Sequence, residues 1–145
     1  MSTRAYALGT FFLFACAGPD SAQVGSTAQS VEAQSICVSS FHRQRDCTDS
    51  FIPALVDARV AVDVPPGIRA AGQGAGREEL IKEALEEWKA DSQDGAIGST
   101  CEKMMNAPAG RERSFAPMKA CLEKQRCEEF VPCEIAVISA ELSAR

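Results

Sequence analysis

Seven cysteines in a chain of 145 residues constrain this protein more than any other feature of its sequence. In an exported chain, an even set of cysteines usually forms disulfides that stabilise a small domain, whereas in a cytosolic chain cysteines more often mark a metal or redox site. The length corresponds to a single domain. Which role the cysteines have therefore depends on whether the chain carries an export signal, and on their spacing.

The N-terminus has the layout of a secretory signal peptide. Arg4 is followed by an apolar run from Ala5 to Ala15, and no acidic residue occurs before Asp20. One cation before a short apolar segment is typical of a signal peptide, and the run is about half of the ~20 residues that a membrane-spanning helix needs. We therefore predict that residues 1–15 are a signal peptide and that the protein is exported.

The residues Leu13-Phe14-Ala15-Cys16 resemble the lipobox of bacterial lipoproteins. The resemblance implies cleavage before Cys16, a lipid on its sulfur and a membrane as partner through that anchor. Because Ala17 is not acidic, it also favours the outer membrane over the inner one. The alternative is an A-x-A cleavage site at Ala15-Cys16-Ala17, which would release a secreted protein beginning at Gly18.

Either cleavage removes Cys16 from the set of pairing thiols and leaves an even number. The chain has no C-x-x-C pair, and its single histidine, His42, is expected at the surface among cationic neighbours. Close cysteine pairs are the usual mark of a zinc or redox site, so we expect neither a metal nor a cofactor. We predict instead that disulfides form among Cys37, Cys47, Cys101, Cys121, Cys127 and Cys133.

The remaining chain predicts an all-α fold, a small disulfide-stapled bundle of about four to five helical segments. Residues 16–30 are small and polar without apolar periodicity, which predicts a flexible tether before a helical domain over 31–145. The segment 51–62 is also compatible with a strand, because many of its residues are β-branched. Apolar spacing and caps predict five longer helical pieces over 31–47, 51–62, 77–93, 114–124 and 127–142, and a further short one over 99–105.

The clearest helix, over 77–93, has one apolar stripe and one acidic face. Trp88 lies on the stripe, so we expect it to anchor the core, and the acidic face to be solvated. The three methionines of the C-terminal half are expected to fill the core rather than to bind a metal. The glycine-rich segment 70–76 is expected to be a plain linker. The residues of the stripe are Leu80, Ile81, Ala84, Leu85 and Trp88, and the methionines are Met104, Met105 and Met118.

Helix geometry narrows the disulfide pairing. Cys37 and Cys47 lie about 15 Å apart on one helix and cannot bond. The last three cysteines would point in three directions on one straight helix, which predicts a bend near Gln125-Arg126. If the helix over 31–47 packs antiparallel to the last segment, the expected pairs are Cys47–Cys121, Cys37–Cys133 and Cys101–Cys127.

Two segments near the ends of the domain share a pattern. Cys47-Thr48-Asp49-Ser50-Phe51-Ile52-Pro53 matches Cys127-Glu128-Glu129-Phe130-Val131-Pro132, with a cysteine followed by an aromatic, an aliphatic and a proline. The match suggests that one device, a cysteine at a helix junction before an aromatic-aliphatic-proline first turn, is used twice.

The sequence contains no combination of residues that indicates a reaction. No nucleophile, base and orienting group can be grouped, and paired carboxylates occur only as neighbours on helix surfaces, so we predict no catalytic residues and no enzyme. The net charge of −5 argues against nucleic acid as a partner. We expect an exported interaction or structural module of the bacterial cell envelope, with an envelope protein as a possible partner. The alternative is an exported enzyme or thiol redox carrier that uses an unpaired cysteine.

Overall fold

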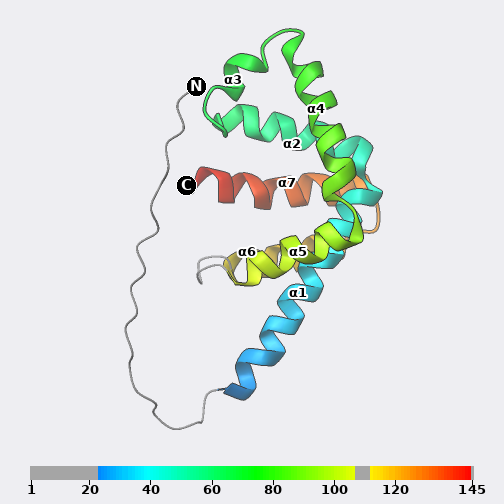
Figure 1. Cartoon of the computed structure of the whole chain (residues 1–145), viewed down its shortest axis with the longest axis vertical. Coiled ribbons are helices and arrows are strands. Elements are labelled where there is room, and N and C mark those ends of the chain that lie inside the picture. The colour runs from blue at the N-terminus through cyan, green and yellow to red at the C-terminus, as the bar shows by residue number, and fades with distance from the viewer. Residues whose placement is uncertain (1–22, 107–111, 145) are drawn as a thin grey trace, which may run out of the picture.

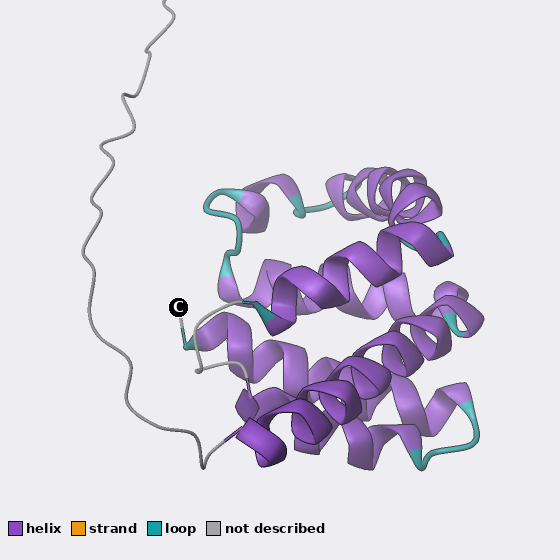
Figure 2. Ribbon diagram, turned by 60° about the horizontal axis from the view of Figure 1, so that its bottom comes forward, coloured by secondary structure: helices purple, strands orange, loops and turns teal. Residues whose placement is uncertain are grey.

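The computed structural model describes residues 23–106 and 112–144, and this part of the chain is helical without strands (Figures 1 and 2). The all-α prediction is confirmed, with more helices than the expected four to five. The described residues form α1 (Gln23–Asp46), α2 (Thr48–Val62), α3 (Ile68–Ala71), α4 (Gly76–Asp91), α5 (Asp94–Met105), α6 (Glu112–Leu122) and α7 (Cys127–Ser143). The predicted signal peptide and Cys16 lie outside the described residues. Within the described ranges, no helix has the length and apolarity needed to cross a membrane.

Two helices, α1 and α5, begin five or more residues earlier than the sequence predicts. α1 begins at Gln23, within the range expected to be a tether, because extending an existing helix by one residue is far easier than starting one. α5 begins at Asp94, directly after the extended residue Gln93, so Ser99–Glu102 lies inside the helix and is not its cap. Burial of Ile97 and Cys101 on one face of α5 outweighs the two glycines in its sequence.

The fully buried apolar residues form two clusters rather than one. The first lies where α2 packs on α7 and where α4 and the end of α6 cover them; the second lies where α1 packs on α5 and α6. Val137 of α7 packs against both clusters and so joins them. The first cluster contains Cys47, Phe51, Ile52, Cys121, Phe130 and Val131, and the second contains Cys37, Ile97, Cys101, Phe115 and Met118.

A Phe-x-Pro sequence occurs in three helices and has the same orientation in each. Its phenylalanine is buried every time, as Phe51 in α2, Phe115 in α6 and Phe130 in α7. The proline follows two residues later, which is about 200° around a helix, so it lies on the outer side. The sequence predicts Pro53 and Pro132 in the first turns of their helices. α2 begins at Thr48 and α7 at Cys127, so both prolines lie further inside.

Three disulfides connect the helices, and their pairing differs from the prediction. The bonds are Cys37–Cys101, Cys47–Cys127 and Cys121–Cys133, with Cα–Cα distances of 5.8, 5.5 and 5.6 Å. The predicted pairs Cys47–Cys121, Cys37–Cys133 and Cys101–Cys127 are therefore wrong.

The pairing prediction failed because it placed the helix over 31–47 directly on the last segment. In the structure α1 packs mainly on α5 and α6, while α7 packs on α2 (Figure 1). The expected bend does exist, over residues 123–126 between α6 and α7. It brings Cys121 and Cys133 together across the turn, which leaves Cys127 for Cys47.

Candidate functional site

A cleft of about 360 Å³ lies between the two core clusters. Residues of α1, α2, α4, α5, α6 and α7 line it. Aromatic and aliphatic side chains make up most of its wall, with a few polar groups among them, which is the usual make-up of a small-molecule site. The apolar wall includes Phe41, Phe51, Ile52, Leu55, Ala84, Trp88, Met104, Met118, Val137 and Ile138.

A buried carboxyl group, that of Glu134 on α7, lies in the inner wall of this cleft. Ser40 Oγ donates a hydrogen bond of 2.6 Å to Glu134 Oε1, and Gln44 Nε2 donates a second one of 2.9 Å to the same oxygen. Ser40 and Gln44 are one turn apart on α1, so both face α7. No described residue makes a hydrogen bond with the other oxygen, Oε2. A buried polar atom without a partner typically costs about 1–3 kcal/mol, which makes this oxygen an exception that a purely structural role does not explain.

The surroundings of Glu134 favour its neutral form. Burial removes water from the carboxylate and raises the pKa of Glu134 above its ordinary value of 4.5, while the hydrogen bonds from Ser40 and Gln44 oppose that rise. The nearby Glu141 raises the pKa further. A raised carboxyl pKa in a cleft is a common property of functional sites, although buried structural acids share it.

Trp88 forms the aromatic wall of the cleft. Its ring stacks on Phe41 with centroids 6.2 Å apart and lies tilted against Phe51 at 5.8 Å. Its indole N–H donates a hydrogen bond to Thr48 Oγ1 at 2.9 Å, which links the ring on α4 to the first residue of α2. Trp88 packs on the first core cluster, as the sequence predicts, and it also lines the cleft.

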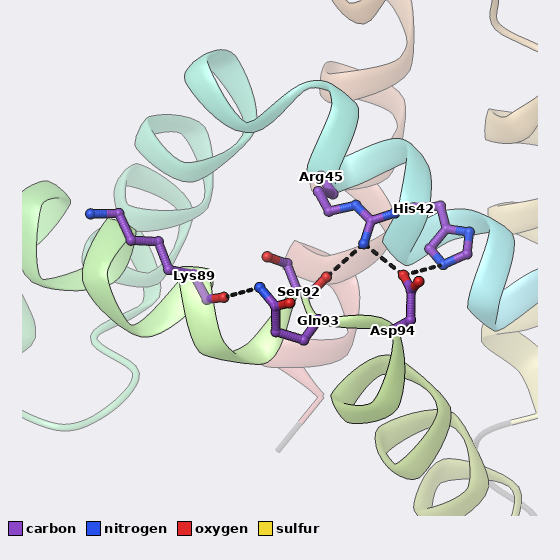
Figure 3. A network of polar contacts seen from close by, with 6 residues as sticks. All are labelled: His42, Arg45, Lys89, Ser92, Gln93 and Asp94. Carbon is purple, nitrogen blue, oxygen red and sulfur yellow. Dashed lines mark hydrogen bonds and ion pairs between the residues drawn. The ribbon is translucent and has the colours of Figure 1, made fainter.

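A surface network holds the junction of α4 and α5 against α1 (Figure 3). Arg45 Nη1 donates to Asp94 Oδ1 at 2.7 Å and to the backbone oxygen of Ser92 at 2.9 Å. His42 Nε2 lies 3.5 Å from the same Asp94 oxygen. The hydrogen bond from Arg45 lowers the pKa of Asp94. The network holds the end of α4 and the start of α5 against α1, and it places His42 at the surface, in agreement with the prediction.

The charged residues around the cleft are mainly acidic. Glu87 and Asp91 of α4 and Glu141 of α7 belong to the lining, and with Glu134 they make four carboxyl groups. Among the described lining residues, Arg59 of α2 is the one cation. A cleft with acidic groups and low-dielectric walls concentrates a negative potential and attracts cationic molecules.

The sequence located the walls of this site but missed its polar centre. Trp88, Met104 and Met118 were predicted as core residues, and the fold places them along the cleft. The local sequence does not predict that Glu134 is buried, because it follows Cys133 in an ordinary helix and its neighbours do not distinguish it from an exposed glutamate. Ser40 and Gln44 carry a faint signal, since both share the helical stripe of Cys37 on α1 and polar residues on a buried stripe need partners.

No family model, curated protein or solved structure matches this chain at a significant level.

Proposed function

We propose that this protein is an exported, disulfide-stabilised helical binding module of the bacterial cell envelope, anchored through a lipid on Cys16. The cleft between the two core clusters is its binding site, and its ligand is a small, largely apolar molecule. The observation that carries the proposal is the cleft itself, with about 360 Å³ lined by aromatic, aliphatic and methionine side chains. Methionines adapt their shape to a ligand more readily than branched side chains do.

Two observations support export. The three disulfides fit an extracellular or otherwise oxidising compartment. The segment Leu13–Cys16 resembles a lipobox, and the polar segment after it would separate the domain from a membrane surface. The residue after the lipid-bearing cysteine, Ala17, favours the outer membrane.

The alternative function is an exported enzyme or a redox carrier that uses an unpaired cysteine. All six cysteines in the described part of the chain are disulfide-bonded, which supports the binding module instead. Counting thiols on the denatured, exported protein separates the two. Fewer than one thiol per two molecules supports the binding module, and one or more per molecule supports the redox carrier.

The mass of the mature protein tests the anchor. Cleavage before Cys16 with lipidation gives an N-terminal peptide that starts at Cys16 and carries diacylglycerol, and the Cys16→Ser variant loses both the lipid and membrane association. A mature protein that begins at Gly18 without a lipid would contradict the anchor and support the A-x-A cleavage.

The fluorescence of Trp88, the chain's single tryptophan, tests the cleft. We expect octan-1-ol to change this fluorescence saturably in the purified mature protein. Ala84 lines the cleft, whereas Ala90 is exposed on the same helix, so Ala84→Phe and Ala90→Phe form a matched pair. Binding that Ala84→Phe weakens at least tenfold and Ala90→Phe leaves unchanged supports the cleft. An absence of saturable binding to the wild type would contradict it.

A further inference from the structure

The cleft holds a carboxyl oxygen that has no hydrogen-bond partner among the described residues. Of the two oxygens of Glu134, Oε1 receives hydrogen bonds from Ser40 and Gln44, whereas Oε2 has no partner among the described residues. Glu134 is completely buried and lies in the cleft wall. The molecule best suited to this position therefore brings a hydrogen-bonding group to Oε2.

The charges around the cleft limit which hydrogen-bonding group a ligand can bring to Oε2. Three further carboxyl groups, those of Glu87, Asp91 and Glu141, share the lining with Glu134, against the single guanidinium of Arg59. An anionic ligand would be repelled. A neutral alcohol could form a hydrogen bond with Oε2, but it would bring no positive charge to a lining that holds four carboxyl groups.

We propose that the cleft binds a small amphipathic amine, whose nitrogen pairs with Glu134 Oε2 and whose apolar body packs against Phe41, Phe51 and Trp88. This inference rests on the proposed function, because it names the class of ligand for the same cleft. An amine suits Glu134 in either protonation state: an ammonium ion pairs with the carboxylate, and a neutral amine accepts the proton of the carboxylic acid. Both routes give the same ion pair, with one proton on nitrogen and none on Oε2.

The aromatic side chains provide a surface for the apolar part of the ligand. Trp88 contacts both Phe41 and Phe51, with ring centroids 6.2 and 5.8 Å apart. The same rings supply the apolar surface that the body of the ligand would cover.

The size of the cleft and its flexible side chains give the ligand room. An apolar cavity of about 150 Å³ accommodates benzene, so a cleft of about 360 Å³ has space for a longer ligand. Glu134 is shielded from solvent, and Met104 and Met118 line the same cleft. Their unbranched thioether chains can change rotamer, which lets the cleft adapt to a ligand.

Octylamine and octan-1-ol test the inference, since they share an eight-carbon chain and differ in the head group. Titrations of the purified mature protein are followed by the fluorescence of Trp88 and by calorimetry. We expect octylamine to bind at least ten times more tightly than octan-1-ol. Glu134→Gln keeps an oxygen for Ser40 and Gln44 but removes the charge, so it should reduce the preference for octylamine to less than threefold. Glu141→Gln, which removes a carboxylate elsewhere in the lining, should keep most of the preference.

The outcomes separate the inference from the function on which it rests. If both probes bind the wild type with equal affinity, the amine inference fails and the apolar binding module stands. If neither probe binds, the proposed function fails as well. A preference for octylamine that persists in Glu134→Gln would also overturn the inference, because the other carboxylates of the lining would then explain the preference.

A second variant covers the case in which Glu134→Gln does not fold, as judged by its circular dichroism. Ala84→Phe narrows the cleft without touching Glu134, and Ala90→Phe controls for the added ring. We expect Ala84→Phe to weaken octylamine binding at least tenfold and Ala90→Phe less than twofold. Equal octylamine affinity in both would overturn the inference, since the amine would then bind outside the cleft.

Discussion

Cys47 and Cys127 hold corresponding positions in two similar segments of the chain, and they are bonded to each other with their Cα atoms 5.5 Å apart. The residues that follow them, Phe51-Ile52 and Phe130-Val131, meet in the first core cluster. The repeated pattern of the sequence is thus a structural pair, because the two copies begin α2 and α7 and pack against each other. One wall of the cleft is built on this pair, since Phe51 and Ile52 also line it.

The disulfide pairing can be mapped directly on the non-reduced protein. We expect three linked peptide pairs, joining Cys37 to Cys101, Cys47 to Cys127 and Cys121 to Cys133. No lysine or arginine separates Cys127 from Cys133, so trypsin must be followed by a glutamate-specific protease that cleaves at Glu128 or Glu129. Recovery of a peptide that links Cys47 to Cys121 would contradict the structure.

The disulfides should differ in how much they stabilise the fold. In the chain-entropy model the 80-residue separation of Cys47 and Cys127 corresponds to about 4.5 kcal/mol, and the 12-residue separation of Cys121 and Cys133 to about 3 kcal/mol. Urea unfolding of the two double Cys→Ser variants measures the difference. A larger loss for the Cys121/Cys133 variant would mean that local packing, rather than loop length, decides the contribution.

Removal of a central aromatic side chain should destabilise the domain strongly. Phe130 is fully buried in the first core cluster, so we expect Phe130→Ala to lower the free energy of unfolding by about 3–5 kcal/mol. Val31 is 69% exposed, and Val31→Ala serves as the control with an expected loss below about 0.5 kcal/mol. Similar losses for the two variants in urea unfolding would show that Phe130 is not in the core.

The orientation of Trp88 should depend on one hydroxyl group. Thr48 Oγ1 accepts the indole N–H and donates to the backbone oxygen of Arg45 at 2.7 Å. We expect Thr48→Val to cost about 1–2 kcal/mol and to shift the emission of Trp88, because both hydrogen bonds are lost. Thr48→Ser keeps the hydroxyl and should change neither property appreciably. Identical emission in Thr48→Val and the wild type would contradict the contact.

Glu134 should make stability depend on pH in a definite direction. Burial raises its pKa in the folded protein above the ordinary 4.5, so over the interval above about 4.5 the folded state binds more protons than the unfolded state. The contribution of Glu134 to stability is therefore present below this interval and is lost as pH rises through the raised pKa. The hydrogen bonds from α1, donated by Ser40 and Gln44, reduce the size of the effect, and Glu141 of α7 increases it.

The difference between the wild type and Glu134→Gln isolates this effect. The exposed acids whose pKa values are lowered lose their contribution to stability as pH falls, but this loss is the same in both proteins. These acids are Glu32, Asp57, Glu86 and Asp94. We expect the stability of the wild type relative to Glu134→Gln to fall as pH rises from 4 to 8 in urea unfolding. A difference that is constant over this range would mean that the pKa of Glu134 is the same in the folded and unfolded states.

The sequence by itself determined the helical class and most of the helices, because their apolar spacing, capping residues and prolines act locally. It also predicted that six cysteines pair, that a bend separates α6 from α7, and that Trp88 packs into the core. Each of these follows from a short stretch of chain or from the parity of the cysteines, so no knowledge of helix packing is required.

The tertiary structure decided which helices meet, and with that the disulfide pairing and the cleft. The sequence does not show that α1 packs on α5 and α6 while α7 packs on α2, since any of these apolar faces could cover another. The burial of Glu134 depends on the same choice, because only the approach of α1 to α7 brings Ser40 and Gln44 to its carboxyl group. The polar centre of the cleft is thus made by residues 90 and 94 positions apart, which local patterns cannot connect.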